Sequence, residues 1–432
     1  MKTILLFGAG KSATILIDYL IQQSQVNDWR LVIADENLEL ARSKSGGSPF
    51  ALPVQINVND NESRNALIGK ADVVISMLPP WLHLLVAENC ISAGRHLLTA
   101  SYADEQMKML APAIKQRGIL FLCEMGLDPG IDHMSAMHMI HRLKDQGAHI
   151  SSFVSHCGGL VAPESDDNSW HYKISWNPRN VVTAGKAGAV YKQDGQIQQL
   201  PYSKIFDPRR SVEIVQHETF AWYPNRDSLL YIPLYGLEEC STFVRTTLRH
   251  PDFCTGWKKI VELQLTDETK KYNTEGLRFC DFFTMHLKHW GLTDAVKLSG
   301  MESSLLNDLG LFDEEKIDNG LCTAADVLQK TIEKKLLLRP TDKDMIIMQH
   351  EMEYLLDKKS KKLLSTLVVK GEDASYTAMA KTVGLPLGIA AKRILRGEMK
   401  LSGLHIPIIP EIYNPVLNDL EQEGIAFQTR YL

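Results

Sequence analysis

A glycine-rich turn lies between an apolar strand and a helix at the start of the chain, and it constrains the fold more than any other feature. Residues 4–7 predict a buried strand, and the apolar spacing of residues 14–21 predicts a helix. Between them, Gly8 allows a tight turn, Gly10 lets backbone N–H groups approach a phosphate, and Ala13 replaces the third glycine of the usual pattern. The arrangement predicts a dinucleotide with its pyrophosphate at the positive N-terminus of the helix.

The next apolar strand, predicted over residues 29–34, ends at an acid. Asp35 follows Gly10 by about 25 residues, near the spacing expected of an acid that binds a ribose 2′-hydroxyl. Asp35 therefore favours NAD over NADP. In the alternative interpretation Asp35 only caps a turn, and Arg42 and Lys44 bind a 2′-phosphate, so the cofactor is NAD or NADP.

Strands and helices alternate from residue 1 to about 126. Further strands are predicted over residues 54–58, 72–78, 96–100 and 119–123. This alternation predicts an α/β fold with a doubly wound parallel sheet of the Rossmann type. The loops at the carboxyl ends of its strands should line the cofactor crevice, and they contain Met77-Leu78-Pro79-Pro80, Ser101-Tyr102 and Gly126-Leu127-Asp128.

Beyond Gly130 the pattern changes to strand-like segments with turn signals, which predicts a second, mixed α/β domain. Residues 254–356 look mainly helical, with helices expected over 281–289, 324–337 and 344–356. They predict a helical insert. A strand over 362–370 and closing helices over 375–384 and 387–395 follow.

Charge, apolar content and cysteine spacing exclude several classes of protein. The net charge of −5 argues against nucleic acid as a partner, and no apolar run approaches the roughly 18 residues of a membrane span. The seven cysteines form no CxxC pair, as is typical of reduced thiols. His133, His138 and His141 match no zinc motif and suggest a polar helix face. We expect no metal and, since residue 2 leads directly into a strand, a cytoplasmic protein.

Polar residues follow the fifth and sixth predicted strands and should face the nicotinamide end of the crevice. Ser101 and Tyr102 follow the fifth strand, and Asp128 follows the sixth. Asp128 is also placed to be a helix N-cap, with Pro129 at the first helical position. Either interpretation puts polar groups at the site.

Three later segments carry arginine: residues 176–179, 223–228 and 245–251. Because arginine matches carboxylate geometry with two hydrogen bonds, arginines gathered in one pocket would imply a substrate with several carboxylates. The alternative for any single arginine is a surface ion pair.

These motifs resemble those of the saccharopine dehydrogenases of the glutamate-forming type, also called saccharopine reductases, over nearly the whole chain. The segments that carry the resemblance are residues 8–10, 99–102, 126–133, 157–160, 223–228 and 247–249. The resemblance implies a nucleotide domain completed by the C-terminus, a substrate-binding and dimerisation domain, and a helical domain inserted in it. The expected parts are residues 1–128 with about 380–432, 129–253 with about 357–379, and 254–356.

The resemblance also implies a reaction and a homodimer. Saccharopine loses a hydride to NAD or NADP, and the resulting imine is hydrolysed to 2-aminoadipate 6-semialdehyde and L-glutamate. The three carboxylates of saccharopine agree with the arginine-rich segments. The residues implied to contact substrate are Ser101, Tyr102, Asp128, Arg226, Arg245, Thr246 and Thr247, and those implied to contact cofactor are Ala9, Gly10, Lys11 and Ser12.

This chemistry needs a proton acceptor for the amine and a base that activates water. Asp128, Tyr102 and Cys157 are the candidates. Asp128 ranks first, because a carboxylate in a partly desolvated cleft can have a raised pKa suited to a base. Cys157 ranks last, because a lone thiol is most often simply buried.

The chain departs from the family pattern in places that bear on specificity. Fungal members are generally NADP-linked with a basic residue near the end of the second strand, where Asp35 would repel a 2′-phosphate. Val161 and Thr246 stand where proline and glycine are usual. Two other functions stay open: a reductase of another carboxylated secondary amine such as carboxynorspermidine, and a nicotinamide-binding sensor without catalysis.

Overall fold

The computed structural model describes residues 1–214, 218–293 and 298–432, which divide into two compact units. Unit 1 consists of Met1–Gly147 and Ser375–Phe427, and unit 2 of Ala148–Ala374 and Gln428–Leu432. The boundaries differ from the expected ones at several points. Residues 131–145 belong to unit 1 and residues 428–432 to unit 2, and the segment expected as an insert is part of unit 2.

A seven-stranded parallel sheet forms the centre of unit 1. Its strand order is β17-β6-β5-β4-β1-β2-β3, which contains the 3-2-1-4-5-6 order of a Rossmann fold. The doubly wound sheet predicted from the alternation is confirmed. Its strands are β1 (Thr3–Phe7), β2 (Arg30–Asp35), β3 (Ala51–Gln55), β4 (Val73–Ser76), β5 (His96–Thr99), β6 (Leu120–Leu122) and β17 (Gly403–His405).

The third strand lies three residues earlier than predicted. β3 pairs with β2 from Ala51 to Gln55, so the prediction over 54–58 is wrong at both ends. Pro53 lies inside this strand, and it is tolerated because β3 is the edge of the sheet, where one side of the backbone needs no partner.

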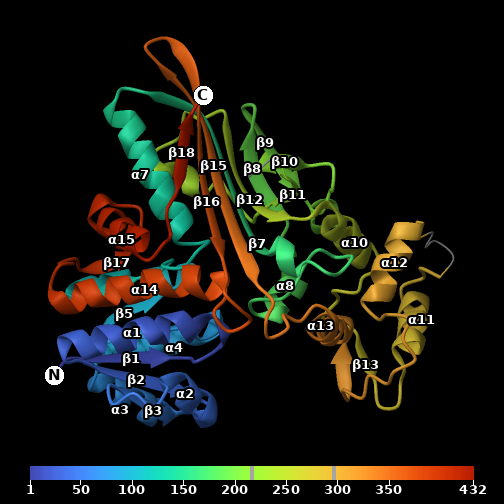
Figure 1. The fold of residues 1–432 in the computed structure, drawn as a ribbon, viewed down its shortest axis with the longest axis horizontal. Coiled ribbons are helices and arrows are strands. Elements are labelled where there is room, and N and C mark those ends of the chain that lie inside the picture. The colour runs from blue at the N-terminus through green and yellow to red at the C-terminus, as the bar shows by residue number, and fades with distance from the viewer. Residues whose placement is uncertain (215–217, 294–297) are drawn as a thin grey trace. The chain divides into compact units, whose positions relative to one another are not determined.

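Helices cover the sheet of unit 1. They are η1 (Lys11–Ala13), α1 (Thr14–Asn27), α2 (Leu38–Ser45), α3 (Asn61–Gly69), η2 (Pro80–Leu82), α4 (His83–Ala93), α5 (Glu105–Met109), α6 (Ala111–Gln116), α7 (Ile131–Asp145), α14 (Ala378–Arg396) and α15 (Pro410–Gln422). Figure 1 shows α1 and α14 side by side. None of the helices in the three described ranges is long and apolar enough to cross a lipid bilayer.

Helix α14 is one helix, not the two closing helices predicted from the sequence. It runs through Pro386 without a break. Its glycines let it approach α1 closely, because a Cβ at Gly384 would lie 2.9 Å from the Cβ of Leu16, and one at Gly388 would lie 2.7 Å from the Tyr19 ring. The C-terminal part of the chain is thereby packed against the first helix of unit 1.

A nine-stranded mixed sheet forms the centre of unit 2, as the prediction of a mixed α/β domain requires. Seven strands follow the order β10-β11-β12-β7-β15-β16-β18, and the β8-β9 hairpin joins at β12. The strands are β7 (His149–Val161), β8 (Ala189–Gln193), β9 (Gln196–Leu200), β10 (Ser211–Ile214), β11 (Glu218–Pro224), β12 (Thr242–Arg249), β15 (Asp344–Leu356), β16 (Lys359–Lys370) and β18 (Gln428–Tyr431).

The helix predicted over residues 344–356 is wrong, because this segment is strand β15. It pairs with β7 on one side and with β16 on the other, and Figure 1 shows the three as long neighbouring arrows. Residues 344–350 are all buried, so the alternation that marks a half-exposed strand is absent. A continuous apolar run cannot be distinguished from a buried helix by its period, and here the two hydrogen-bonded neighbours decide the structure.

The helical part of unit 2 shares one hydrophobic core with the segments before it. That core contains Trp170 and Tyr172 together with Trp257 of α10 and Phe282 of α11. The helices are η3 (Pro163–Ser165), α8 (Pro178–Thr183), η4 (Tyr202–Lys204), α9 (Tyr231–Tyr235), α10 (Pro251–Glu262), α11 (Phe279–His289), α12 (Gly300–Asp308) and α13 (Ala324–Lys335), and a two-stranded sheet joins β13 (Lys271–Asn273) to β14 (Leu321–Thr323).

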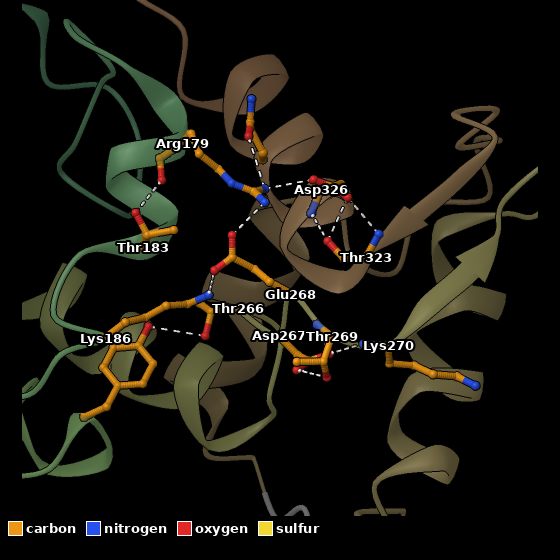
Figure 2. A network of polar contacts seen from close by, with 12 residues as sticks. Arg179, Thr183, Lys186, Thr266, Asp267, Glu268, Thr269, Lys270, Thr323 and Asp326 are labelled. Atoms are coloured by element: carbon orange, nitrogen blue, oxygen red, sulfur yellow. Dashed lines mark hydrogen bonds and ion pairs between the residues drawn. The ribbon is translucent and has the colours of Figure 1, made fainter. Parts of the chain in front are cut away.

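One arginine of the predicted carboxylate-binding segments has a structural role instead. Figure 2 shows the Arg179 side chain between α13 and the segment before β13. Its Nη1 donates to Asp326 Oδ1 at 2.8 Å and its Nη2 to Glu268 Oε1 at 2.7 Å. Asp326 also accepts from the backbone N–H of Thr323 at the start of α13. Arg179 therefore follows the alternative interpretation, an ion pair.

Candidate functional site

The glycine-rich turn joins β1 to η1 as predicted. Gly8 has φ +94°, and a Cβ there would lie 3.1 Å from the carbonyl oxygen of Met77 at the end of the neighbouring strand β4. At Gly10, in contrast, a Cβ would meet nothing within 4 Å. The space beside Gly10, at the N-terminal end of η1 and α1, fits the approach of a pyrophosphate.

Asp35 binds the glycine turn. Its Oδ2 accepts the N–H of Ala9 at 2.6 Å, and its Oδ1 accepts the N–H of Asn37 at 2.8 Å. The turn-capping interpretation thus describes part of what this side chain does. Asp35 also borders an open depression whose other lining residues are Glu36, Asn37, Leu38, Glu39 and Gln55.

The two basic residues considered for a 2′-phosphate already have partners. The Lys44 ammonium donates to the Gly10 carbonyl and to Thr14 Oγ1, each at 2.7 Å. Burial lowers the pKa of Lys44 to about 8. The Arg42 guanidinium pairs with Glu39 at 2.7 Å on the surface.

Ser101 is held by a histidine that the sequence interpretation missed. The His83 ring bonds to Ser76 through Nδ1 at 2.8 Å and to Ser101 through Nε2 at 2.9 Å, with Thr99 Oγ1 3.2 Å from the same Nε2. Burial lowers the pKa of His83 to about 4, so the ring is neutral near pH 7. His83 lies just beyond Leu78 and Pro80, at the start of α4, and the proline pair was the only local signal that this segment turns into the crevice.

Tyr102 and Asp128 come together at the carboxyl edge of the sheet. The Tyr102 hydroxyl donates to Asp128 Oδ1 at 3.3 Å, and both side chains are half-buried. The N-cap prediction for Asp128 is wrong, because α7 begins at Ile131. Its first turn uses Asp132 instead, whose Oδ1 accepts the N–H of Gly130 at 2.6 Å. The Asp128 carboxylate contacts the Tyr102 hydroxyl.

A tight turn fixes where Asp128 stands. Gly126 N–H donates to the Pro129 carbonyl at 2.9 Å, and Gly130 has φ +147°. A Cβ at Gly130 would lie 2.0 Å from the carbonyl oxygen of Gly126, so no other residue fits there. The requirement for glycine at position 130 of this motif is therefore steric.

A buried acid and histidine connect the Tyr102 loop to helix α7. Glu124 accepts the N–H of Ala103 through Oε1 at 3.1 Å and contacts His133 Nε2 through Oε2 at 2.9 Å. The His133 side chain is completely buried, so the prediction that it shares a polar helix face with His138 and His141 is wrong. The sequence interpretation overlooked Glu124, an isolated acid at the end of a strand.

In unit 2 the predicted substrate residues lie on adjacent strands. Thr247 of β12 pairs with Cys157 of β7, and side chains at paired positions of neighbouring strands share a face. Arg245 shares that face with Thr247. Thr246 points to the opposite one, where its Oγ1 lies 2.6 Å from His156 Nδ1. Because side chains alternate along β12, Thr246 lies on the opposite face from Arg245 and Thr247.

The two predicted arginines of unit 2 are brought near each other by backbone pairing between their segments. Asn225 N–H donates to the Arg245 carbonyl at 2.8 Å, just beyond the paired residues of β11 and β12, and Arg226 is the next residue of the chain. Arg245 is buried, with its guanidinium carbon 4.4 Å from the centre of the Tyr231 ring. Arg226 is exposed and has φ +54°. Substrate contact by these residues stays a prediction.

Two family models match nearly the whole chain. One, described as the saccharopine dehydrogenase NADP binding domain, matches residues 4–122, and another, the saccharopine dehydrogenase C-terminal domain, matches residues 126–425. Their junction lies between β6 and the Asp128 turn.

Individual relatives agree with the models. The saccharopine dehydrogenase [NADP(+), L-glutamate-forming] of Saccharomyces cerevisiae is 32% identical over 98% of this chain and 97% of its own length. The mitochondrial alpha-aminoadipic semialdehyde synthase of Bos taurus is 33% identical over 99% of this chain, which spans only 48% of that longer protein. The solved apo saccharopine dehydrogenase (L-Glu forming) of S. cerevisiae superposes with a TM-score of 0.89 at 30% identity, over the full length of both chains. The chain therefore belongs to the saccharopine dehydrogenase family.

Proposed function

We propose that this chain is a nicotinamide-dependent saccharopine dehydrogenase of the L-glutamate-forming type. In the proposed reaction, saccharopine, NAD(P)+ and water give 2-aminoadipate 6-semialdehyde, L-glutamate, NAD(P)H and a proton. The observation that carries the proposal is the Tyr102–Asp128 pair at the carboxyl edge of a Rossmann sheet, beside a glycine turn that fits a dinucleotide. Ligands of such sheets bind at this edge.

Asp128 is the proposed base. A bound nicotinamide ring would accept the hydride from the carbon beside the secondary amine of saccharopine. Loss of the amine proton to Asp128 frees the nitrogen lone pair that drives this transfer. The carboxylate then releases that proton to solvent, takes a proton from the water that attacks the imine, and passes it to the departing glutamate nitrogen. Tyr102, which donates to Asp128, holds the carboxylate in place, and Ser101 is held by His83 on the same edge.

Cys157 is the weakest candidate for the base. It lies buried on β7 opposite Thr247, in a strand interior. A positioned carboxylate is already ionised near neutral pH, whereas a thiol must first lose its proton to act as a base. We propose that Cys157, Thr247 and Arg245 shape the substrate side of unit 2, with Arg226 and Arg245 as the guanidinium groups for carboxylates.

We further propose that NAD is preferred over NADP. The depression beside Asp35 also contains Glu36 and Glu39, so a 2′-phosphate would meet three carboxylates. Lys44 donates to the glycine turn and Arg42 pairs with Glu39, which leaves neither cation directed at a 2′-phosphate. This preference departs from the NADP(+) in the printed name of the yeast relative.

One experiment tests reaction, substrate and cofactor together. Initial rates are measured with saccharopine and with carboxynorspermidine, each with NAD+ and NADP+, for the wild type and for Asp35→Ser. We expect turnover of saccharopine alone, with kcat/KM higher for NAD+, and a ratio that moves toward NADP+ in the variant. Turnover of carboxynorspermidine alone would contradict the substrate, no turnover at all would contradict catalysis, and preference for NADP+ would contradict the role of Asp35.

A further inference from the structure

A cluster of two imidazoles and two carboxylates lies in unit 2, apart from every residue assigned above. His171 comes from the segment between η3 and α8, and His250 and Asp252 come from the start of α10. The rings of His171 and His250 are tilted by 33° with respect to each other, with centroids 3.8 Å apart. His171 Nε2 lies 3.5 Å and His250 Nδ1 3.7 Å from Asp252 Oδ2. One ligand atom from each residue lies within 4.8 Å of the other two.

Hydrogen bonds determine which ring nitrogens carry lone pairs. The Asp166 carboxylate lies 2.6 Å from His171 Nδ1 and can only accept there, so in the neutral ring the lone pair lies on Nε2, toward Asp252. His250 Nδ1 accepts the backbone N–H of Asp252 at 3.3 Å, a long hydrogen bond that an ion on this nitrogen would replace. Two ring nitrogens and a carboxylate oxygen thus converge on one space, where a cation would be attracted.

We propose that His171, His250 and Asp252 bind one divalent transition-metal ion, with Zn²⁺ the best match, and that Asp166 orients His171 from outside. Tetrahedral Zn²⁺ with bonds near 2.1 Å places its ligand atoms about 3.4 Å apart, close to the spacing in the cluster. Mixed nitrogen and oxygen donors suit Zn²⁺ better than Mg²⁺ or Ca²⁺. Two carboxylates and two neutral imidazoles balance its charge.

Two further observations support a ligand at this place. Asp166 Oδ1 is buried and, among the described residues, has no hydrogen-bond partner, so it can accept from a water on the metal. The carboxylate–histidine–metal arrangement that Asp166 would complete is the usual second layer of zinc sites. His171 also has φ +47°, a strained conformation for a residue other than glycine, which this site would explain.

The proposed ion would join two segments that are far apart in the sequence. It would connect the loop after β7 to the N-terminus of α10, whose Trp257 lies in the core beside Trp170. The site would therefore stabilise unit 2, because an ion that binds only the folded chain raises its free energy of unfolding. The expectation of no metal rested on helix spacing and could not detect this juxtaposition.

Calorimetric titration of the chelator-treated full chain with ZnCl₂ tests the proposal without an activity assay. We expect one Zn²⁺ per chain, at least tenfold weaker binding in His250→Gln and Asp252→Asn, and binding weakened 10- to 100-fold in Asp166→Asn. His149→Gln is the matched control, because His149 pairs with Glu239 on the surface at 3.5 Å and should bind no structural ion. Its affinity should equal that of the wild type.

Co²⁺ substitution keeps the test decisive if a variant does not fold. The wild type with one equivalent of Co²⁺ should show the visible absorption of a four-coordinate site with nitrogen and oxygen ligands, and Zn²⁺ should remove it. Absence of saturable Zn²⁺ binding in the wild type, or wild-type affinity in both folded Asp252→Asn and His250→Gln, would overturn the proposal. So would a Co²⁺ spectrum of an octahedral, solvent-like ion.

Discussion

At the residue scale, the Tyr102–Asp128 pair is the part of the site with the most clearly defined proposed catalytic role. We predict that Asp128→Asn lowers kcat by a factor of about 10² to 10⁴, the usual contribution of a general base. The amide keeps the shape and can still accept from Tyr102, so cofactor affinity should not change. Steady-state rates measure the first effect and NADH fluorescence titration the second. Unchanged turnover would remove Asp128 from the mechanism.

Two buried histidines make stability depend on pH. Burial lowers the pKa of His83 and of His156 to about 4, from an ordinary value of 6.5. The unfolded chain therefore binds protons below about pH 6.5 that the folded chain refuses, and stability is full above that pH and falls toward pH 4. Each histidine should cost on the order of 2 kcal/mol between pH 7 and pH 5.

Urea unfolding at pH 7 and pH 5 measures this loss. His156→Gln removes one titrating group, so the difference between the two pH values should shrink by its share. The exposed His138→Gln is the control and should leave the difference as it is in the wild type. An unchanged pH difference in His156→Gln would show that His156 is not the group responsible.

At the scale of elements, tight contact between α1 and α14 depends on glycine. We predict that Gly384→Ala lowers the free energy of unfolding by up to about 2 kcal/mol, because the new methyl group would lie 2.9 Å from Leu16, a clash that costs about 1–3 kcal/mol. The gain in helix propensity, about 1 kcal/mol, is smaller than this clash. Gly69→Ala at the end of α3, where a Cβ meets nothing within 4 Å, should instead stabilise. Denaturant unfolding of both variants compares the signs.

The elements also show what sequence patterns can and cannot predict. The N-terminal part of the parallel sheet of unit 1 followed from alternation, because its strands and helices are coded locally, whereas β17 was not predicted. Strand β15 did not, because its burial on both faces comes from neighbours far along the chain. At the site, Asp128 and Tyr102 were found through motifs, whereas Glu124 and His83 are single polar residues whose partners only the fold brings near.

At the scale of the whole molecule, we propose that two copies of the chain associate through unit 2. The support is the family resemblance, in which the second domain carries dimerisation. Multi-angle light scattering should give a particle of twice the chain mass of 48.6 kDa, with no change over a tenfold dilution. A mass of one chain per particle would contradict this prediction.

The order of the units along the chain has a consequence for synthesis. Strand β17 belongs to the sheet of unit 1 and helix α14 packs against α1, yet both are encoded after nearly all of unit 2. When β6 has been synthesised, more than half of the protein is still to be translated. At that stage β6 lacks its neighbour β17, and α1 lacks its packing partner α14. The Rossmann sheet of unit 1 can therefore be completed only after α14 and β17 have been synthesised.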